Sequence, residues 1–121
     1  MGEAWVWYNL GSSSGALHIG VWRVSYAAVA DCDAGTTADV YVSLSTANNS
    51  ESNAEMTSFF NVDDTTQDRG IRTVERSRVL VMAAKTTHYL VAKVVSGSAI
   101  ASVDFRGDKV KTLVLAECAH L

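Results

Sequence analysis

The side chains with the most direct routes to catalysis are three histidines and two cysteines: His18, His88, His120, Cys32 and Cys118. A histidine can act as a general base near neutral pH, and a cysteine beside a histidine can act as a nucleophile. None of the histidines lies in an HExxH pair, and the chain has no phosphate-binding loop and no glycine-rich dinucleotide fingerprint. The sequence therefore predicts a protein that is not an enzyme.

The two cysteines allow more than one structural role. Cys32 and Cys118 could form a disulfide if the last strand lies beside the strand that ends near Cys32. Otherwise they are two small buried thiols, which is the usual state of free cysteines. Together with His120 they could supply three zinc ligands, but the chain has no CxxC pair and specifies no fourth ligand. We expect two buried thiols, no metal and no cofactor.

Charged residues cluster in the middle of the chain. Arg72, Arg76 and Arg78 share one face of a predicted strand. The preceding segment is acidic and contains Asp63, Asp64 and Asp68. These aspartates lack the alternating oxygen ligands and the closing glutamate of an EF-hand, so a polar turn is expected rather than a calcium site. The arginines could form charge pairs within a subunit or across a symmetric interface, or they could form a solvated strand face.

The overall charge and the aromatic residues constrain the possible partners. The chain has 10 Lys and Arg against 13 Asp and Glu, and no aromatic residues interleave with the arginines, so nucleic-acid binding is not expected. If the N-terminal segment is a strand, Trp5 and Trp7 share a face and Tyr8 lies on the other. Such aromatic residues could stack on sugar rings, anchor a contact between subunits or close one end of the core.

The elements that must position these residues are β-strands. Valine is twice as frequent as leucine, 16 against 8, and β-branched side chains favour strands. Asp39–Thr46 alternates apolar and polar residues, and Leu17–Ala30 changes phase, which predicts a bulge or corner near Val21–Trp22. Gly11–Gly15 is expected to be a turn. The other predicted strands are Trp5–Leu10, Ile71–Ala83, Thr86–Ser96, Ala99–Phe105 and Val110–Ala119.

The one long polar stretch, Ala47–Gly70, is expected to hold a short strand or helical turn anchored by Phe59 and Phe60. Seven or eight strands without an amphipathic helix predict an all-β fold, a single antiparallel β-sandwich or jelly-roll-like domain over residues 1–121. No apolar run approaches the roughly 20 residues that span a bilayer. The N-terminus lacks the features of a secretory signal, so synthesis in the cytoplasm is expected.

Several predicted strands are apolar on both faces, notably Val79–Met82 and Leu113–Ala116. One sandwich of this size has a single interior, so a second apolar face suggests burial against another subunit. The chain also has no proline to protect the edges of its sheets. We therefore expect a homo-oligomer, a dimer or trimer; the alternative is that these strands lie centrally under loops.

Three segments of the C-terminal half form a pattern of their own: Arg76–Val81, Thr86–Lys93 and the final segment Ala116–Leu121. This pattern resembles small β-sandwich virion proteins of tailed bacteriophages, a group that includes capsid decoration (cement) proteins and tail-fibre modules. The resemblance implies a non-enzymatic structural protein of the virion that decorates a capsid and acts by burying surface at subunit junctions. It also implies a capsid or tail protein as partner.

A second function class is a receptor- or carbohydrate-binding module, such as the tip of a tail fibre. Such a module would use Trp5, Trp7 and Tyr8, or the loops of Ala47–Gly70, to bind a surface glycan.

Overall fold

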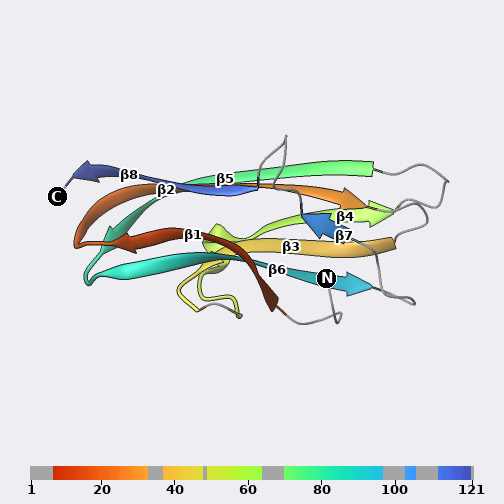
Figure 1. Cartoon of the computed structure of the whole chain (residues 1–121), viewed down its shortest axis with the longest axis horizontal. Coiled ribbons are helices and arrows are strands. Elements are labelled where there is room, and N and C mark those ends of the chain that lie inside the picture. Colours follow the sequence, from red (N-terminus) through yellow and green to blue (C-terminus); the bar gives the residue numbers. More distant parts are fainter. Residues whose placement is uncertain are drawn as a thin grey trace.

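The computed structural model describes residues 7–32, 37–47, 49–63, 70–96, 103–105 and 112–120, and these form an all-β sandwich of two antiparallel sheets (Figure 1). This architecture confirms the predicted fold class. The strands are β1 (Trp7–Leu17), β2 (Gly20–Cys32), β3 (Thr37–Ser45), β4 (Ser58–Asp63), β5 (Gly70–Met82), β6 (Thr86–Ser96), β7 (Val103–Phe105) and β8 (Leu113–His120).

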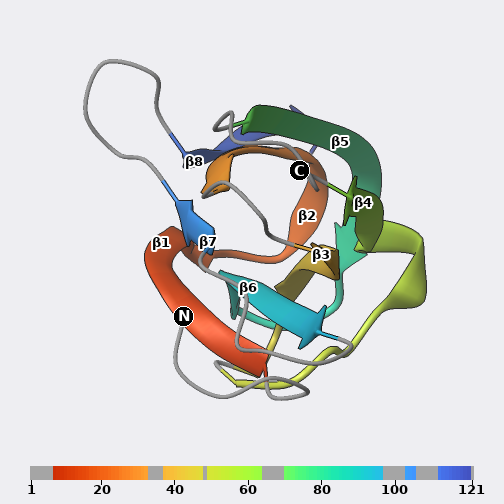
Figure 2. The same ribbon diagram turned by 90° about the vertical axis from the view of Figure 1, so that its right-hand side faces the viewer.

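The chain passes repeatedly from one sheet to the other. The first sheet, sheet A, has the order β1-β6-β3-β4. The second, sheet B, has β5 on one side of β2, and both β7 and β8 pair with the other side of β2. Every connection except β3–β4 and β7–β8 therefore crosses between the sheets. Figure 2 shows β8, β2 and β5 stacked over β1, β6 and β3.

The core lies between the sheets and is built from alternate residues of each strand. On β3 the inward residues are Val40, Val42 and Leu44, all fully buried, as the alternation in Asp39–Thr46 predicts. They pair in register with Val94, Ala92 and Leu90 of β6. Sheet B contributes Val24, Tyr26, Ala28 and Ala30 from β2. The period of two along each strand thus determines which side chains the sandwich buries.

The sequence predicted one long strand over Leu17–Ala30. In the structure this segment contains the end of β1 and most of β2. The chain leaves sheet A after Leu17 and enters sheet B at Gly20. The phase change in the sequence reflects this crossing. The irregularity predicted near Val21–Trp22 is present, because the pairing of β2 with β8 shifts its register between these two residues.

Gly11–Gly15 is not a turn but part of β1, which corrects the sequence prediction. The φ angles of Gly11 and Gly15 are 88° and 71°, in the left-handed region that glycine enters without a Cβ penalty. The register between β1 and β6 shifts at two places, between Asn9 and Ser13 and between Ser13 and Ala16. The glycines therefore bend the strand through bulges instead of ending it.

The polar stretch holds both a helical turn and a strand, as expected. A 3-10 turn, η1 (Ala54–Met56), precedes β4, and the Asn53 side chain caps it by accepting the N–H of Glu55 at 3.0 Å. Met56 is fully buried and Phe60 packs against the core, whereas Phe59 points outward and is 55% exposed. Phe59 is therefore not an anchor. Among the described residues, no helix is long and apolar enough to cross a membrane.

The register of sheet B excludes a disulfide between the two cysteines. Cys118 pairs with Trp22, whereas Cys32 pairs with Gly70 and Val103 at the other end of β2. Ten residues of a strand separate these positions, which is about 33 Å at the usual rise per residue. Cys118 is a free, exposed thiol, so the expectation that it is buried is wrong.

Candidate binding face on sheet A

Four side chains from the four strands of sheet A form a continuous row. Trp7 of β1 pairs with Lys93 of β6, Lys93 with Tyr41 of β3, and Tyr41 with Phe59 of β4. Residues paired across antiparallel strands project from the same face of the sheet. Because the neighbouring residues Val42 and Ala92 face the core, these four face away from it. We call Trp7, Lys93, Tyr41 and Phe59 the aromatic row.

The rings of the aromatic row contact one another and surround the lysine charge. The centroids of Trp7 and Tyr41 lie 6.5 Å apart at an interplanar angle of 61°, and those of Tyr41 and Phe59 lie 5.1 Å apart at 45°. The Nζ of Lys93 lies 5.1 Å from the Trp7 ring centroid and 5.0 Å from that of Tyr41. Such cation–π contacts contribute roughly 0.5–1 kcal/mol each at exposed sites. The row is therefore an ordered, tilted set of rings with one positive charge in its middle.

A pair of hydrogen-bonding side chains lies beside the aromatic row. Asp39 and Asn61 pair in register on the same face, two residues from Tyr41 and Phe59 along their strands. The Asn61 amide donates to the Asp39 carboxylate at 2.7 Å, and Asn61 is exposed. This bond holds both side chains in place and leaves further acceptor and donor positions available on their outer sides.

The opposite side of the row is bordered by the connection between β3 and β4. Ser43, the next outward residue of β3 after Tyr41, is fully buried. The Oγ1 of Thr57 lies 3.0 Å from the Ser43 Oγ and 2.5 Å from a carboxylate oxygen of Glu51. The connection thus covers this part of the outer face, whereas the aromatic row and the Asp39–Asn61 pair stay at least partly exposed.

The structure separates the aromatic residues that the sequence grouped together. Trp7 belongs to the row on the outer face, whereas Tyr8 pairs with Ala92 on the inner face. Trp5 lies outside the described residues. Tyr41 and Phe59 were not predicted as site residues. Their outward positions are readable from the strand alternation, but their adjacency to Trp7 depends on a strand order that no local pattern contains.

Arg76 and Arg78 of the predicted arginine face lie on the core side of β5, where Arg76 is half-buried and Arg78 is exposed. Arg76 pairs with Tyr26, and Arg78 with Val24, so both project from the core side of β5 at the edge of sheet B. Their Nε atoms donate to the carbonyl oxygen of Glu55, at 2.6 Å from Arg76 and 3.5 Å from Arg78. These arginines therefore close the sandwich edge against η1.

The remaining charged residues of this prediction are placed only in part. Arg72 lies on β5 and Asp63 ends β4, but their side chains lie outside the described part of the structure, as do Asp64 and Asp68 entirely. The charge pairs predicted between these aspartates and the arginines stay a prediction.

The residues considered for chemistry do not gather in the described part of the chain. Gly11–Gly15 matches the letters of a GxSxG pattern around Ser13, but it lies within β1 and not on the strand-to-helix turn of a nucleophile elbow. His18 is exposed and its ring contacts Trp22 at a centroid distance of 5.0 Å. His88 lies on β6, facing inward. No group of three or more metal-binding side chains occurs among the described residues.

Comparison of the chain with protein-family models, with curated proteins and with solved structures gives no match. The chemistry of the aromatic row and its neighbours is therefore the basis for a functional assignment.

Proposed function

We propose that this chain is a non-catalytic β-sandwich that binds carbohydrate on the outer face of sheet A. The observation that carries the proposal is the aromatic row, which crosses all four strands and has the Asp39–Asn61 pair beside it. Aromatic faces stack on the apolar C–H faces of sugar rings, while carboxylate and amide groups hydrogen-bond neighbouring hydroxyls. Both kinds of group are present here on one surface.

The geometry of the row favours a soluble glycan chain over a flat polysaccharide surface. The angles of 61° and 45° between successive rings mean that the rings do not form one plane. A flexible glycan can place successive sugars against tilted rings, whereas a flat crystalline surface cannot contact them all. Lys93 adds a donor for hydroxyl or carboxylate oxygens between two of the rings.

Affinity measurements with single-residue variants test this function. Purified protein is screened against a glycan array, and the strongest binders are measured by titration calorimetry. Tyr41→Ala and Phe59→Ala each remove one ring and should weaken binding by about tenfold or more, as truncation of a central contact residue does. Val79→Ala, a matched control on the outer face of sheet B, should bind as the unchanged protein does. Unaltered binding in both ring variants would overturn the proposal.

A second candidate function is that of a structural subunit, and the outer face of sheet B favours it. Val79, Val81 and Leu115 are 52%, 76% and 58% exposed on this face. Arg23 and Glu117 pair in register between them. A second copy related by a two-fold axis could cover the apolar residues and place Arg23 of one copy against Glu117 of the other.

The mass of the protein in solution distinguishes the two candidates. Self-association should appear in sedimentation velocity as a dimer or trimer, and Val81→Asp should shift it to monomer. A monomer at all concentrations would exclude the subunit role and leave carbohydrate binding unaffected.

The virion role implied by the resemblance needs its own experiment. A capsid decoration protein should raise the rupture temperature of shells that lack it, because it binds only the assembled, folded partner. An unchanged rupture temperature would count against this role.

A further inference from the structure

The free edge of β5 is a long strand edge with which no other strand of the described chain pairs. β5 lies at the margin of sheet B, with β2 on one side (Figure 2). Its 13 residues pair with β2 without a register shift. The edges of sheet A differ, because β1 is interrupted by two register shifts and β4 has six residues. Bulges and short length protect an edge from further pairing, and β5 has neither.

The contacts of Thr112, which directly precedes β8, show which backbone groups of β5 point to this edge. Its Oγ1 accepts the N–H of Val29 at 3.0 Å and donates to the carbonyl oxygen of Val29 at 3.5 Å. Val29 therefore points its backbone groups toward β8, and the alternate residues of β2, which include Tyr26, point theirs toward β5. Tyr26 pairs with Arg76, so the backbone groups of Arg76 point to β2. The residues that alternate with Arg76 point their N–H and C=O groups to the free edge. These are Thr73, Glu75, Ser77, Val79 and Val81.

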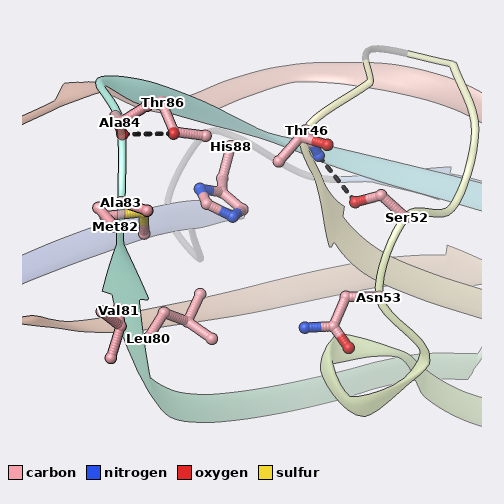
Figure 3. Close-up of a pocket in the computed structure, with 10 residues that line it drawn as sticks. All are labelled: Thr46, Ser52, Asn53, Leu80, Val81, Met82, Ala83, Ala84, Thr86 and His88. Atoms are coloured by element: carbon pink, nitrogen blue, oxygen red, sulfur yellow. Dashed lines mark hydrogen bonds between the residues drawn. The ribbon is translucent and has the colours of Figure 1, made fainter. Parts of the chain in front are cut away.

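The outward side chains near the end of this edge are apolar. Val79 and Val81 are 52% and 76% exposed. β5 then turns into β6 beside a cavity of about 470 Å³ that His88 lines (Figure 3). Figure 3 shows the alternation at this end, where Leu80 points to the side of Asn53 and Val81 points the other way. A strand added to the edge would therefore cover Val79 and Val81 with its own outward side chains.

The core side of the same edge carries two arginines without a carboxylate partner. Arg78 is exposed and Arg76 is half-buried. Their Nε atoms lie 3.5 Å and 2.6 Å from one oxygen, the carbonyl of Glu55, so the two guanidinium groups are held close together. Neither arginine forms an ion pair with a carboxylate among the described residues. Because two neighbouring positive charges repel each other, carboxylates placed beside them would be attracted.

A second copy of β5 cannot supply these carboxylates. Residues opposite each other in paired strands project from the same face of the sheet. The positions of β5 in register with the core side of β2 hold only arginine and apolar residues, namely Arg72, Val74, Arg76, Arg78, Leu80 and Met82. Pairing two copies of β5 would therefore place the arginines against apolar residues or against each other. The edge thus disfavours its own copy and selects a strand of different composition.

We propose that the β5 edge, residues Glu75–Val81, binds an extended acidic segment of a partner protein as an additional strand of sheet B. The segment is acidic opposite Arg76 and Arg78 and apolar opposite Val79 and Val81. For an antiparallel segment this requires the order apolar, any, apolar, acidic, any, acidic from its N-terminus. The edge is separate from the aromatic row, which lies on the outer face of sheet A, so the proposal does not depend on carbohydrate binding.

Two peptides that differ in charge test the role of the arginines. The capped peptide Val-Thr-Val-Glu-Thr-Glu has the required order, and Val-Thr-Val-Gln-Thr-Gln is its neutral control. The full chain is labelled with ¹⁵N, and affinities are taken from amide shifts during titration. The acidic peptide should bind about fivefold more tightly, as expected for two partly exposed ion pairs. The double variant Arg76→Gln, Arg78→Gln should lose this preference, whereas Arg23→Gln, an exposed arginine of β2, should keep it.

Methylation of single peptide nitrogens tests the strand pairing itself. The third residue of the peptide lies opposite Val79, so its N–H points to β5, whereas the N–H of the fourth residue, opposite Arg78, points away. Methylation at the third residue should weaken binding about tenfold, the loss expected for one hydrogen bond, and methylation at the fourth should have little effect. The amides of Ser77 and Val79 should also exchange more slowly with solvent when the peptide is bound.

Several results would overturn the proposal. Equal affinity for the acidic and neutral peptides would show that the arginines do not select the segment. Equal effects of the two methylations, or unchanged exchange at Ser77 and Val79, would show that the edge does not pair with the peptide. Protection of these two amides that rises with protein concentration in the absence of peptide would show that a second copy occupies the edge. All of these measurements use the unchanged protein, so they decide the question even if the double variant fails to fold.

Discussion

The hydroxyl of Tyr26 joins the two sheets inside the core, and its removal tests how the sandwich is held together. Tyr26 belongs to β2 of sheet B. Its oxygen lies 2.7 Å from the Met56 carbonyl, 3.0 Å from the Val42 carbonyl and 2.6 Å from the Ser58 hydroxyl, all on the side of sheet A. A phenolic hydroxyl has one hydrogen, so it can satisfy one carbonyl while it accepts a bond from Ser58.

Tyr26→Phe keeps the ring and removes this hydroxyl. The carbonyl of Met56, a fully buried residue, then loses the donor from Tyr26. An unsatisfied buried acceptor costs roughly 1–3 kcal/mol, and the packing of the ring is unchanged. We expect the free energy of unfolding to fall by about 1–3 kcal/mol. At about 4 °C per kcal/mol for a domain of this size, Tm should fall by roughly 4–12 °C.

Urea denaturation followed by tryptophan fluorescence measures this change, with Tyr41→Phe as the control that removes a hydroxyl from the outer face. A free energy of unfolding within about 0.5 kcal/mol of that of the unchanged protein would refute the reasoning, because it would mean that the Met56 carbonyl finds another donor at no cost.

Burial also raises the pKa of Tyr26 above its ordinary value of 10.0. The contribution of Tyr26 to stability is thus present below pH 10 and is lost as the pH rises through the raised pKa.

Three further predictions concern a glycine of β1, the titration of His88 and two leucines that differ in burial. Gly15→Ala should reduce the free energy of unfolding by about 1 kcal/mol in urea denaturation, because φ is 71° and the added Cβ meets no other atom; Gly15→Asn should lose less. Burial lowers the pKa of His88 from 6.5, so its contribution to stability is present above pH 6.5 and is lost as the pH falls through the lowered pKa. His88→Gln should flatten the decline of stability below pH 6.5, as measured by urea denaturation at successive pH values. Leu44→Ala, in the fully buried core, should cost about 2–5 kcal/mol by calorimetry, whereas Leu115→Ala on the exposed face should cost far less.

The sequence by itself determined the class of the fold and the positions of most strands. Alternation in Asp39–Thr46 separated the inward Val40, Val42 and Leu44 from the outward Tyr41, and the structure confirms each of them. Thr86–Ser96 has the same bounds in the structure as in the prediction. These features are local: the period of two follows from the pleat of a single strand and is written into neighbouring residues.

Local signals were misleading where tertiary pairing overrode them. Gly11–Gly15 has the composition of a turn, yet it continues β1 because β6 provides the strand partner and glycine allows the bulges. Free cysteines are usually buried, yet the position of Cys118 near one end of sheet B leaves this thiol exposed.

The aromatic row and the cavity beside His88 depend on contacts between distant segments that only the tertiary structure sets. Trp7, Tyr41, Phe59 and Lys93 come from four separate strands, and they meet because the order β1-β6-β3-β4 and its register bring them into one row. The cavity at His88 likewise joins the β5–β6 turn to the distant connection after β3. A periodic pattern shows which way a side chain faces, but the partner of a strand is set by the packing of the whole core, which no single segment encodes.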